Sequence, residues 1–382
     1  MPRLQRLAHA CRLQPPLSAA AAPRSAPAPS RAAADASPIP SIDVGALFGD
    51  DADAKMRTAQ EIAVACEEIG FFSIHNHGVP TEIVEAAWQQ TAAFFALPEA
   101  TKQQAALMIA DVYDYGYSPL GGETLAAGKQ LELGTEQEQE PAPGDLKEMF
   151  AIGPLTDAFG APPVQWPVAP AGIRPALTSY YREMEKLSSA LLRAFALALE
   201  LPEAWFEDKI DRHMCSLRTL SYPELEAESL ERSAPGQLRA SAHTDYGTLT
   251  LLLQGLESEA HSGSGLQVMA GDGRSGDWRD VPFTPGSFVV NLGDLMSRWT
   301  NERWVSTLHR VVMPRPEQPG SLTRRQSMAF FHNINMDAIV ECIPSCSSAE
   351  DPPHFPPIVA GEFLMKKHHA STGGGGEDSQ AT

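Results

Sequence analysis

Residues 242–253 read AHTDYGTLTLLL and carry the strongest structural signal in the chain. Their second half, 248–253, is a β-branched and apolar run typical of a buried strand. His243 and Asp245 stand just before that run, two positions apart. Side chains with this spacing point to the same side of an extended chain, so an imidazole and a carboxylate can reach one metal ion. The segment therefore predicts a strand with two candidate metal ligands at its entrance.

Further strands are expected on either side of this segment, from about residue 215 onward. Similar apolar runs recur at 266–268, 288–292, 308–312 and 327–331. Turn signals separate them at 271–273, 284–286 and 293–294. We expect no helix between these strands. Short strands at this spacing favour an antiparallel sandwich or jelly roll over a parallel sheet.

The N-terminal half of the chain is expected to be mainly helical. The spacing of apolar residues predicts helices over 51–69, from Thr81 (as N-cap) onward and over 173–200. Short strands are expected at 39–44 and 71–74, and a loop at 121–145. The predicted fold is thus mostly β with a helical N-terminal region, which covers 38–210, followed by a β domain over 211–367.

Residues 1–37 and 368–382 are expected to lie outside the folded domains. The first 34 residues contain five arginines and no acid, which is the composition of a chloroplast or mitochondrial transit peptide. The alternative is a disordered extension that carries no targeting signal, on a cytoplasmic protein. The glycine run at 373–376 predicts a flexible C-terminal tail.

The composition limits the classes of partner. Among 382 residues, 48 are acidic and 29 are basic, which gives a formal charge of −19. This excess argues against general binding to nucleic acid or to an anionic membrane, because such binding needs clustered lysine and arginine. No uncharged apolar run approaches about 18 residues, so no membrane span is expected. The five cysteines are too scattered for a disulfide framework, and Cys342 and Cys346 are read as reduced thiols. We expect a monomer that acts on a small molecule.

His309, inside a later strand-like run, supplies a third candidate ligand. Two imidazoles and one carboxylate form the facial triad of non-haem Fe(II) oxygenases. Two neutral histidines and one aspartate leave Fe(II) with a net positive charge and open positions on one face. Those positions can hold a bidentate co-substrate together with dioxygen. A His-x-Asp pair or a single histidine is by itself more often structural. The interpretation as an iron site therefore depends on a further sequence motif.

The further motif is Arg325-Gln326-Ser327, at the start of the last apolar run. A guanidinium offers a planar fork for a carboxylate, and a nearby hydroxyl adds another donor. Arg324 competes for this role, but alternation along a strand places Arg325 and Ser327 on one face. Beside an iron site, the bound group would be the distal carboxylate of 2-oxoglutarate.

The chain resembles the isopenicillin N synthase-like branch of the Fe(II)/2-oxoglutarate-dependent dioxygenases, over roughly residues 38–367. The matching segments lie at 39–43, 70–72, 76–79, 242–253, 265–268, 285–294, 299–301, 306–311, 325–331 and 361–364. The resemblance implies a double-stranded β-helix, a distorted jelly roll, with N-terminal helices packed against it. It also implies iron bound by His243, Asp245 and His309, and 2-oxoglutarate bound by Arg325 and Ser327.

The implied reaction couples oxidative decarboxylation of 2-oxoglutarate to hydroxylation, desaturation or cyclisation of a small organic substrate. O2 is the oxidant, and ascorbate is an optional reductant. Tyr222, in a Tyr-Pro segment, is a candidate contact to the co-substrate or substrate. The resemblance assigns His75 and His77 to a structural turn. The interval from His243 to His309 is longer than usual, and the extra residues at 258–264 and 271–277 are interpreted as enlarged loops.

Three alternatives stay open. The first is an iron oxidase that carries Arg-x-Ser without consuming 2-oxoglutarate, as isopenicillin N synthase and the plant ethylene-forming oxidase do. The second is a zinc hydrolase using the same ligands, and the third is a binding module without catalysis. The sequence does not identify the substrate. We expect its specificity to come from the N-terminal helices, the segment 113–123 and residues before His309.

Overall fold

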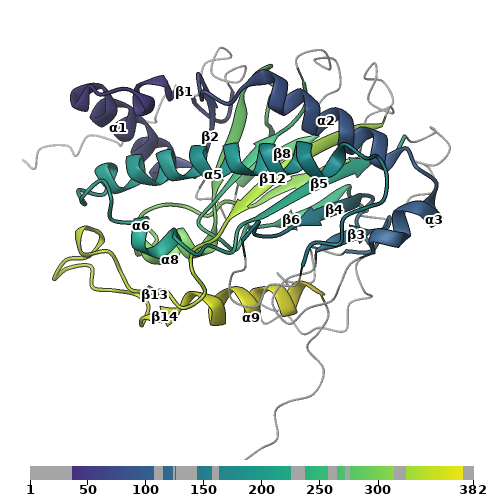
Figure 1. Cartoon of the computed structure of the whole chain (residues 1–382). Coiled ribbons are helices and arrows are strands. Elements are labelled where there is room, and N and C mark those ends of the chain that lie inside the picture. Colours follow the sequence, from purple (N-terminus) through teal and green to yellow (C-terminus); the bar gives the residue numbers. More distant parts are fainter. Residues whose placement is uncertain are drawn as a thin grey trace, which may run out of the picture. The chain divides into compact units, whose positions relative to one another are not determined.

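The computed structural model describes residues 37–106, 115–123, 125, 144–156, 163–224, 237–256, 265–271, 276–313 and 324–372, with side chains through 368. Its largest sheet has the strand order β1-β2-β10-β7-β12-β5-β4-β3 (Figure 1). In that order the strands are Ser41–Asp43, Phe71–His75, Phe288–Leu292, Leu249–Leu253, Arg325–His332, Ser216–Tyr222, Glu148–Ile152 and Gly116–Ser118. All neighbours are antiparallel except β1 and β2, which are parallel.

A second sheet has the order β6-β11-β8-β9. These strands are Ala240–His243, His309–Val311, Leu266–Gly271 and Gly276–Asp280. Side chains of both sheets line one pocket, which is the arrangement of a jelly roll and confirms the predicted fold class. A separate hairpin joins β13 (Ile339–Val340) and β14 (Ile358–Val359).

The large sheet combines strands from before and after residue 211. β2 pairs with β10, and β4 pairs with β5. The N-terminal region therefore supplies four strands, which extend both edges of the sheet. β1 and β2 lie at the strands expected over 39–44 and 71–74, whereas β3 and β4 were not expected. Residues from Ser37 onward form one compact unit.

Helices cover the face of the large sheet that lies away from the pocket. The principal ones are α1 (Ala52–Glu68), α2 (Thr81–Phe95) and α5 (Ile173–Ala198), and α5 runs across the sheet in Figure 1. Tyr181 of α5 makes an edge contact with Phe330 of β12, with ring centroids 5.0 Å apart. Gln326, on the same face of β12 as Phe330, donates to the backbone carbonyl of Trp88 in α2. Alternation along β12 therefore turns Arg325 and Ser327 toward the opposite face.

The end of α1 shows why a glycine stands at position 70. Asp51 caps the start of this helix, where its side chain accepts from the amides of Asp53 and Ala54. Gly70, just past the other end, has φ of +65°, and a Cβ there would lie 1.8 Å from the carbonyl oxygen of Val305. Glycine is required both by the left-handed backbone and by this close approach.

Two local expectations are wrong. A short helix, α8 (Asp294–Trp299), lies between β10 and β11, and Gly293 is its N-cap rather than part of a turn. Six residues are too few to show a helical period, so the sequence pattern hides this helix. Thr81 is the first residue of α2 and not its N-cap, because Pro80 occupies the cap position without a side-chain hydrogen bond.

The remaining elements are short, apart from the C-terminal helix. They are the helices α3 (Glu99–Lys102), α6 (Glu207–Ile210) and α9 (Ala360–Thr372), and three 3-10 helices at Gly45–Phe48, Gln103–Ala105 and Pro344–Cys346. Among the described residues no helix has the length and apolar character needed to span a bilayer. The four described cysteines form no disulfide. Residues 126–143 of the expected loop, the insertion at 258–264 and residues 272–275 of the second insertion lie outside the described residues. Of the second insertion, Gly271 ends β8, and residues 276–277 begin β9.

Candidate active site

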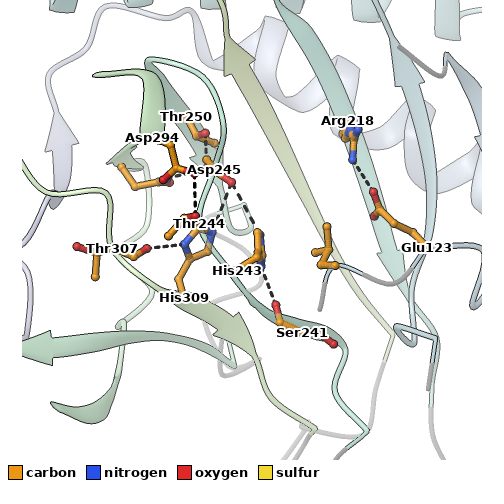
Figure 2. Close-up of polar contacts among 12 residues, drawn as sticks. Glu123, Arg218, Ser241, His243, Thr244, Asp245, Thr250, Asp294, Thr307 and His309 are labelled. Carbon is orange, nitrogen blue, oxygen red and sulfur yellow. Dashed lines mark hydrogen bonds and ion pairs between the residues drawn. The ribbon is translucent and has the colours of Figure 1, made fainter. Parts of the chain in front are cut away.

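The strands of the small sheet bring the two candidate histidine ligands together. His243 ends β6 and His309 begins β11, and the two residues face each other directly across these paired strands. Their ring centroids are 4.3 Å apart. Asp245 Oδ1 lies 3.8 Å from Nε2 of His243 and 3.7 Å from Nε2 of His309 (Figure 2). The potential ligand atoms of His243, Asp245 and His309 all lie within 4.8 Å of one another. Within the part of the chain that the structure describes, no other group of three histidine, cysteine, aspartate or glutamate side chains meets this criterion.

Backbone carbonyls set the tautomer of both imidazoles. Nδ1 of His243 lies 2.7 Å from the carbonyl oxygen of Ser241, and Nδ1 of His309 lies 3.0 Å from that of Thr307. Because a carbonyl only accepts, each Nδ1 carries the proton and each Nε2 presents a lone pair. Both lone pairs are directed toward Asp245, which is the donor arrangement that a metal ion needs.

Two side chains of the large sheet orient Asp245. Its Oδ2 accepts from Thr250 Oγ1 of β7 at 2.5 Å and from Asn291 Nδ2 of β10 at 2.6 Å. Oδ1 is thereby turned toward the histidines. Thr250 and Asn291 were not among the candidate residues predicted from the sequence, although polar residues inside otherwise apolar buried strands are a usable signal.

The buried setting separates the charges of these groups. Burial, together with the nearby His309, lowers the pKa of His243 to about 3, which keeps this imidazole neutral. Burial alone would raise the pKa of Asp245. The imidazoles of His309 and His243 and the hydrogen bonds from Thr250 and Asn291 outweigh it and lower that pKa below its ordinary value. One ionised carboxylate and neutral imidazole therefore face the same point.

The loop that carries Asp245 is fastened to α8 and α9. The amide of Asp294 donates to the carbonyl of Asp245 at 2.8 Å. The Asp294 carboxylate accepts from Thr244 Oγ1 at 3.1 Å and pairs with Lys367 Nζ of α9 at 2.9 Å. The helix that the sequence pattern hid thus supports the loop between the candidate ligands.

Arg325 and Ser327 line the same pocket as the two histidines and Asp245. Both side chains are almost fully buried. Arg325 lies opposite Tyr222 in the β12–β5 pairing, and its guanidinium carbon is 5.0 Å from the centre of the Tyr222 ring. Arg324 does not line the pocket, and its Nε donates to Ser221 Oγ at 3.2 Å. Of the two arginines, only Arg325 is placed to meet a ligand in this pocket.

His75 and His77 lie outside the pocket. His75 contacts Ser41 and Asp43 near the surface. His77 accepts at Nδ1 from the amide of Val79 and lies 3.2 Å from the carbonyl oxygen of Gly286. These contacts are those of a structural turn.

The pocket also contains three charged side chains that the sequence analysis did not single out, namely Glu123, Lys147 and Arg218. Glu123 pairs with both cations. They come from three separate segments, so no local spacing in the sequence indicates that they meet. The rest of the lining is largely apolar, with Phe71, Leu252 and Val311 among its members.

Comparisons with known proteins agree with this geometry. Residues 39–169 match the family described as "non-haem dioxygenase in morphine synthesis N-terminal", and residues 213–334 match the 2OG-Fe(II) oxygenase superfamily. The chain is 32 % identical over 330 residues to the 2-oxoglutarate-Fe(II) type oxidoreductase hxnY of Emericella nidulans, covering 85 % of this chain and 88 % of that one. It is 33 % identical over 314 residues to the 2-oxoglutarate-dependent dioxygenase citB of Monascus ruber, covering 78 % and 85 %.

Among solved structures, a full-length Neurospora crassa protein in complex with alpha-KG and thymine superposes with a TM-score of 0.74. The two sequences are 29 % identical, and the match covers 87 % of this chain and 96 % of the Neurospora chain. A jelly roll that gathers two histidines and an aspartate in a buried pocket defines the class of non-haem metal oxygenases. The chain belongs to the 2OG-Fe(II) oxygenase superfamily and is an Fe(II)/2-oxoglutarate-dependent dioxygenase.

Proposed function

We propose that His243, Asp245 and His309 hold the ferrous ion of this enzyme, and that Arg325 and Ser327 hold the distal carboxylate of 2-oxoglutarate. The reaction converts a C–H bond of a small organic substrate to C–OH, with 2-oxoglutarate and O2 consumed and succinate and CO2 released. The observation that carries the proposal is the convergence of two Nε2 lone pairs and Asp245 Oδ1 on one point.

The donor set fits a divalent iron ion. Imidazole and carboxylate ligands suit Fe(II), and three protein ligands leave coordination positions open for a co-substrate and O2. Iron bound there supplies the redox chemistry. The protein's own part is to hold both imidazoles in the Nε2-binding tautomer through Ser241 and Thr307, and to hold the carboxylate through Thr250 and Asn291.

The surroundings of Arg325 fit a buried carboxylate. Apolar side chains around this end of the pocket, including Ala240, Leu266 and Val311, keep the guanidinium out of bulk water. In such a setting a charge-assisted pair between a guanidinium and a carboxylate is stronger than at the surface. Ser327, two residues further on the same strand face, adds a hydroxyl donor.

The proposal is tested by measuring succinate and CO2 release with Fe(II), 2-oxoglutarate and ascorbate, in the presence of a metabolite extract. The wild-type protein should form succinate. His243→Ala and His309→Ala should each lose bound iron and reduce turnover by roughly 1,000-fold or more, because each removes one of only three ligands. His75→Ala and His77→Ala are matched controls that should keep iron and turnover.

Oxygen consumption without succinate by the iron-loaded wild type would assign the protein instead to the oxidases that draw all electrons from their own substrate. Full iron binding in His243→Ala would contradict the ligand assignment.

We also propose that the protein is a monomer without affinity for nucleic acid or membranes, and that its first 37 residues direct it to an organelle. The net charge of −19 and the five arginines among the first 34 residues, which contain no acid, support these points. Light scattering after size-exclusion chromatography tests the monomer. A fluorescent fusion of residues 1–37, beside one with the five arginines changed to glutamine, tests the targeting. A dimer, or diffuse cytoplasmic fluorescence of the first fusion, would overturn the respective proposal.

A further inference from the structure

The pocket has a second polar region, formed by four side chains that we call the acid–base network: Asp145, Lys147, Glu123 and Arg218. Lys147 Nζ lies 2.9 Å from Glu123 Oε2 and 3.3 Å from Asp145 Oδ2. Arg218 Nη1 donates to Glu123 Oε1 at 2.9 Å. Figure 2 shows Glu123 and Arg218 directed toward each other, to one side of the histidines and Asp245. Asp145 stands behind the pocket wall and accepts from the amide and hydroxyl of Ser241.

The strand register places Arg218 away from the expected 2-oxoglutarate end, whereas Lys147 directly precedes Glu148, which pairs with Ser221 beside Tyr222. In the pairing of β12 with β5, Arg325 lies opposite Tyr222, and Ala329 lies opposite Arg218. Arg218 is therefore four residues along the sheet from Arg325, about 13 Å at the usual rise per residue. Arg218 and the Glu123 carboxylate that it pairs with thus line the part of the pocket left for the oxidised substrate.

The charges of the acid–base network cancel, because Asp145 and Glu123 balance Lys147 and Arg218. Two other buried cations, Arg325 and Arg239, lie at the expected 2-oxoglutarate end, where both guanidinium groups face the ring of Tyr222. Despite burial, the ion pairs lower the pKa of Glu123 and raise that of Lys147, so these two groups stay ionised. An ionic substrate would bring an unpaired charge into this buried space, whereas a neutral one would not.

We propose that Glu123 and Arg218 recognise the substrate, and that they select a neutral molecule with a planar group in which an N–H donor adjoins a C=O acceptor, such as a lactam, a cyclic imide or a carboxamide. The carboxylate of Glu123 accepts from the N–H, and the guanidinium of Arg218 donates to the C=O. The ring of Phe331, 5.5 Å from the Arg218 guanidinium carbon, packs against the planar group. This inference rests on the proposed function, since it takes the pocket as that of the dioxygenase.

The first test is binding of matched probes to the enzyme loaded with Fe(II) and 2-oxoglutarate in the absence of O2. Calorimetry compares glutarimide and 4-methylbenzamide with 4-methylbenzoate and 4-methylbenzylamine, of which the last three share one ring and differ in charge. The two neutral probes should bind about tenfold or more tightly than the ionic ones, because an ionic probe leaves a buried charge unpaired.

Two variants should move the ranking in opposite directions. Glu123→Gln removes a negative charge, so it should weaken amide binding and shift preference toward the benzoate by about tenfold. Arg218→Gln removes a positive charge, so it should weaken amide binding and shift preference toward the amine. Glu207→Gln breaks the exposed Arg193–Glu207 pair far from the pocket and serves as the control that leaves the ranking unchanged. A purely structural role for the network would lower stability without reversing the charge preference.

Equal or undetectable binding of all four probes, or a ranking that neither pocket variant alters, would overturn the inference. Binding of 2-oxoglutarate is measured in the same samples. Its absence in the wild type would contradict the proposed function, whereas its presence with the wrong ranking contradicts only the substrate class. Thermal melting identifies a variant that does not fold. In that case the inference is judged from the probe ranking of the wild type and of the other variant.

Discussion

The small sheet and the large sheet hold their parts of the site by different kinds of contact. In the small sheet, each imidazole is oriented by a carbonyl only two residues earlier, that of Ser241 for His243 and that of Thr307 for His309. In the large sheet, the groups that orient Asp245 come from two strands, with Thr250 on β7 and Asn291 on β10. The first kind of contact arises with the strand itself, and the second exists only once the sheets have assembled.

This difference divides the tasks of the site. Local contacts prepare the neutral ligands, and long-range contacts place the charges, namely the carboxylate of Asp245 and the guanidinium of Arg325. Substitutions in the large sheet should therefore change binding while the two imidazoles keep their orientation. Three predictions test this comparison.

Arg325→Ala should have the largest effect, because it removes the only arginine of the Arg324–Arg325 pair that lines the pocket. Loss of one partner of a buried charged pair costs about 2–5 kcal/mol, so affinity for 2-oxoglutarate should fall about 30-fold or more. Calorimetry on the iron-loaded protein measures it. Arg324→Ala is the matched control and should bind as the wild type does. An equal loss in both variants would show that the two arginines contribute only to overall charge.

Thr250→Val keeps the side-chain shape and removes the hydroxyl that donates to Asp245 Oδ2. Partners that orient a metal ligand typically contribute about 10–100-fold to metal affinity, so Fe(II) binding should weaken by that factor. The pKa of Asp245 should rise, and iron should be lost at a higher pH during acid titration. Thr219→Val is the control, since its hydroxyl donates to the carbonyl of Phe150 away from the pocket. Unchanged iron affinity in Thr250→Val would mean that Asn291 alone orients the carboxylate.

Lys367→Met should have the smallest effect. It breaks the pair with Asp294 that ties α9 to the loop between His243 and Asp245. Ion pairs near the surface contribute about 0–1 kcal/mol, so iron affinity should change less than about fivefold. Competition with a chelator measures this change, and Lys366→Met, at an exposed position of the same helix, is the control. A loss as large as that of Thr250→Val would place the support of the loop in α9 rather than in the large sheet.

Much of the strand content could be predicted from sequence. The apolar run at 288–292 coincides with β10, and the run at 248–253 starts one residue before β7. Buried strands of this kind are continuously apolar, and that property is local. The His-x-Asp spacing and the alternation in Arg325-Gln326-Ser327 are local too, and the structure places these side chains in one pocket. The helix at Asp294–Trp299 was not predicted, because it is too short for its hydrophobic pattern to repeat.

The residues that the sequence analysis missed depend on contacts between distant segments. Glu123, Lys147 and Arg218 lie in three different segments, and nothing in their spacing relates them. Their meeting requires β4 to pair with β5, and it requires the segment after β3 to return to the same side. Likewise, Thr250 and Asn291 reach one carboxylate because β7 and β10 are neighbours in register, Thr250 beside Asn291.

The amino-acid sequence by itself determined the strand-forming runs, the two histidines and one aspartate of the candidate metal site, and the Arg-x-Ser pair, because each is a matter of residue type and short spacing. The tertiary structure alone decided which oxygen of Asp245 faces the imidazoles and which charged side chains from distant segments meet in the pocket. Those properties depend on the pairing of strands that are far apart in the chain. The register of that pairing is set by which side chains of each strand must be buried in the assembled sheets.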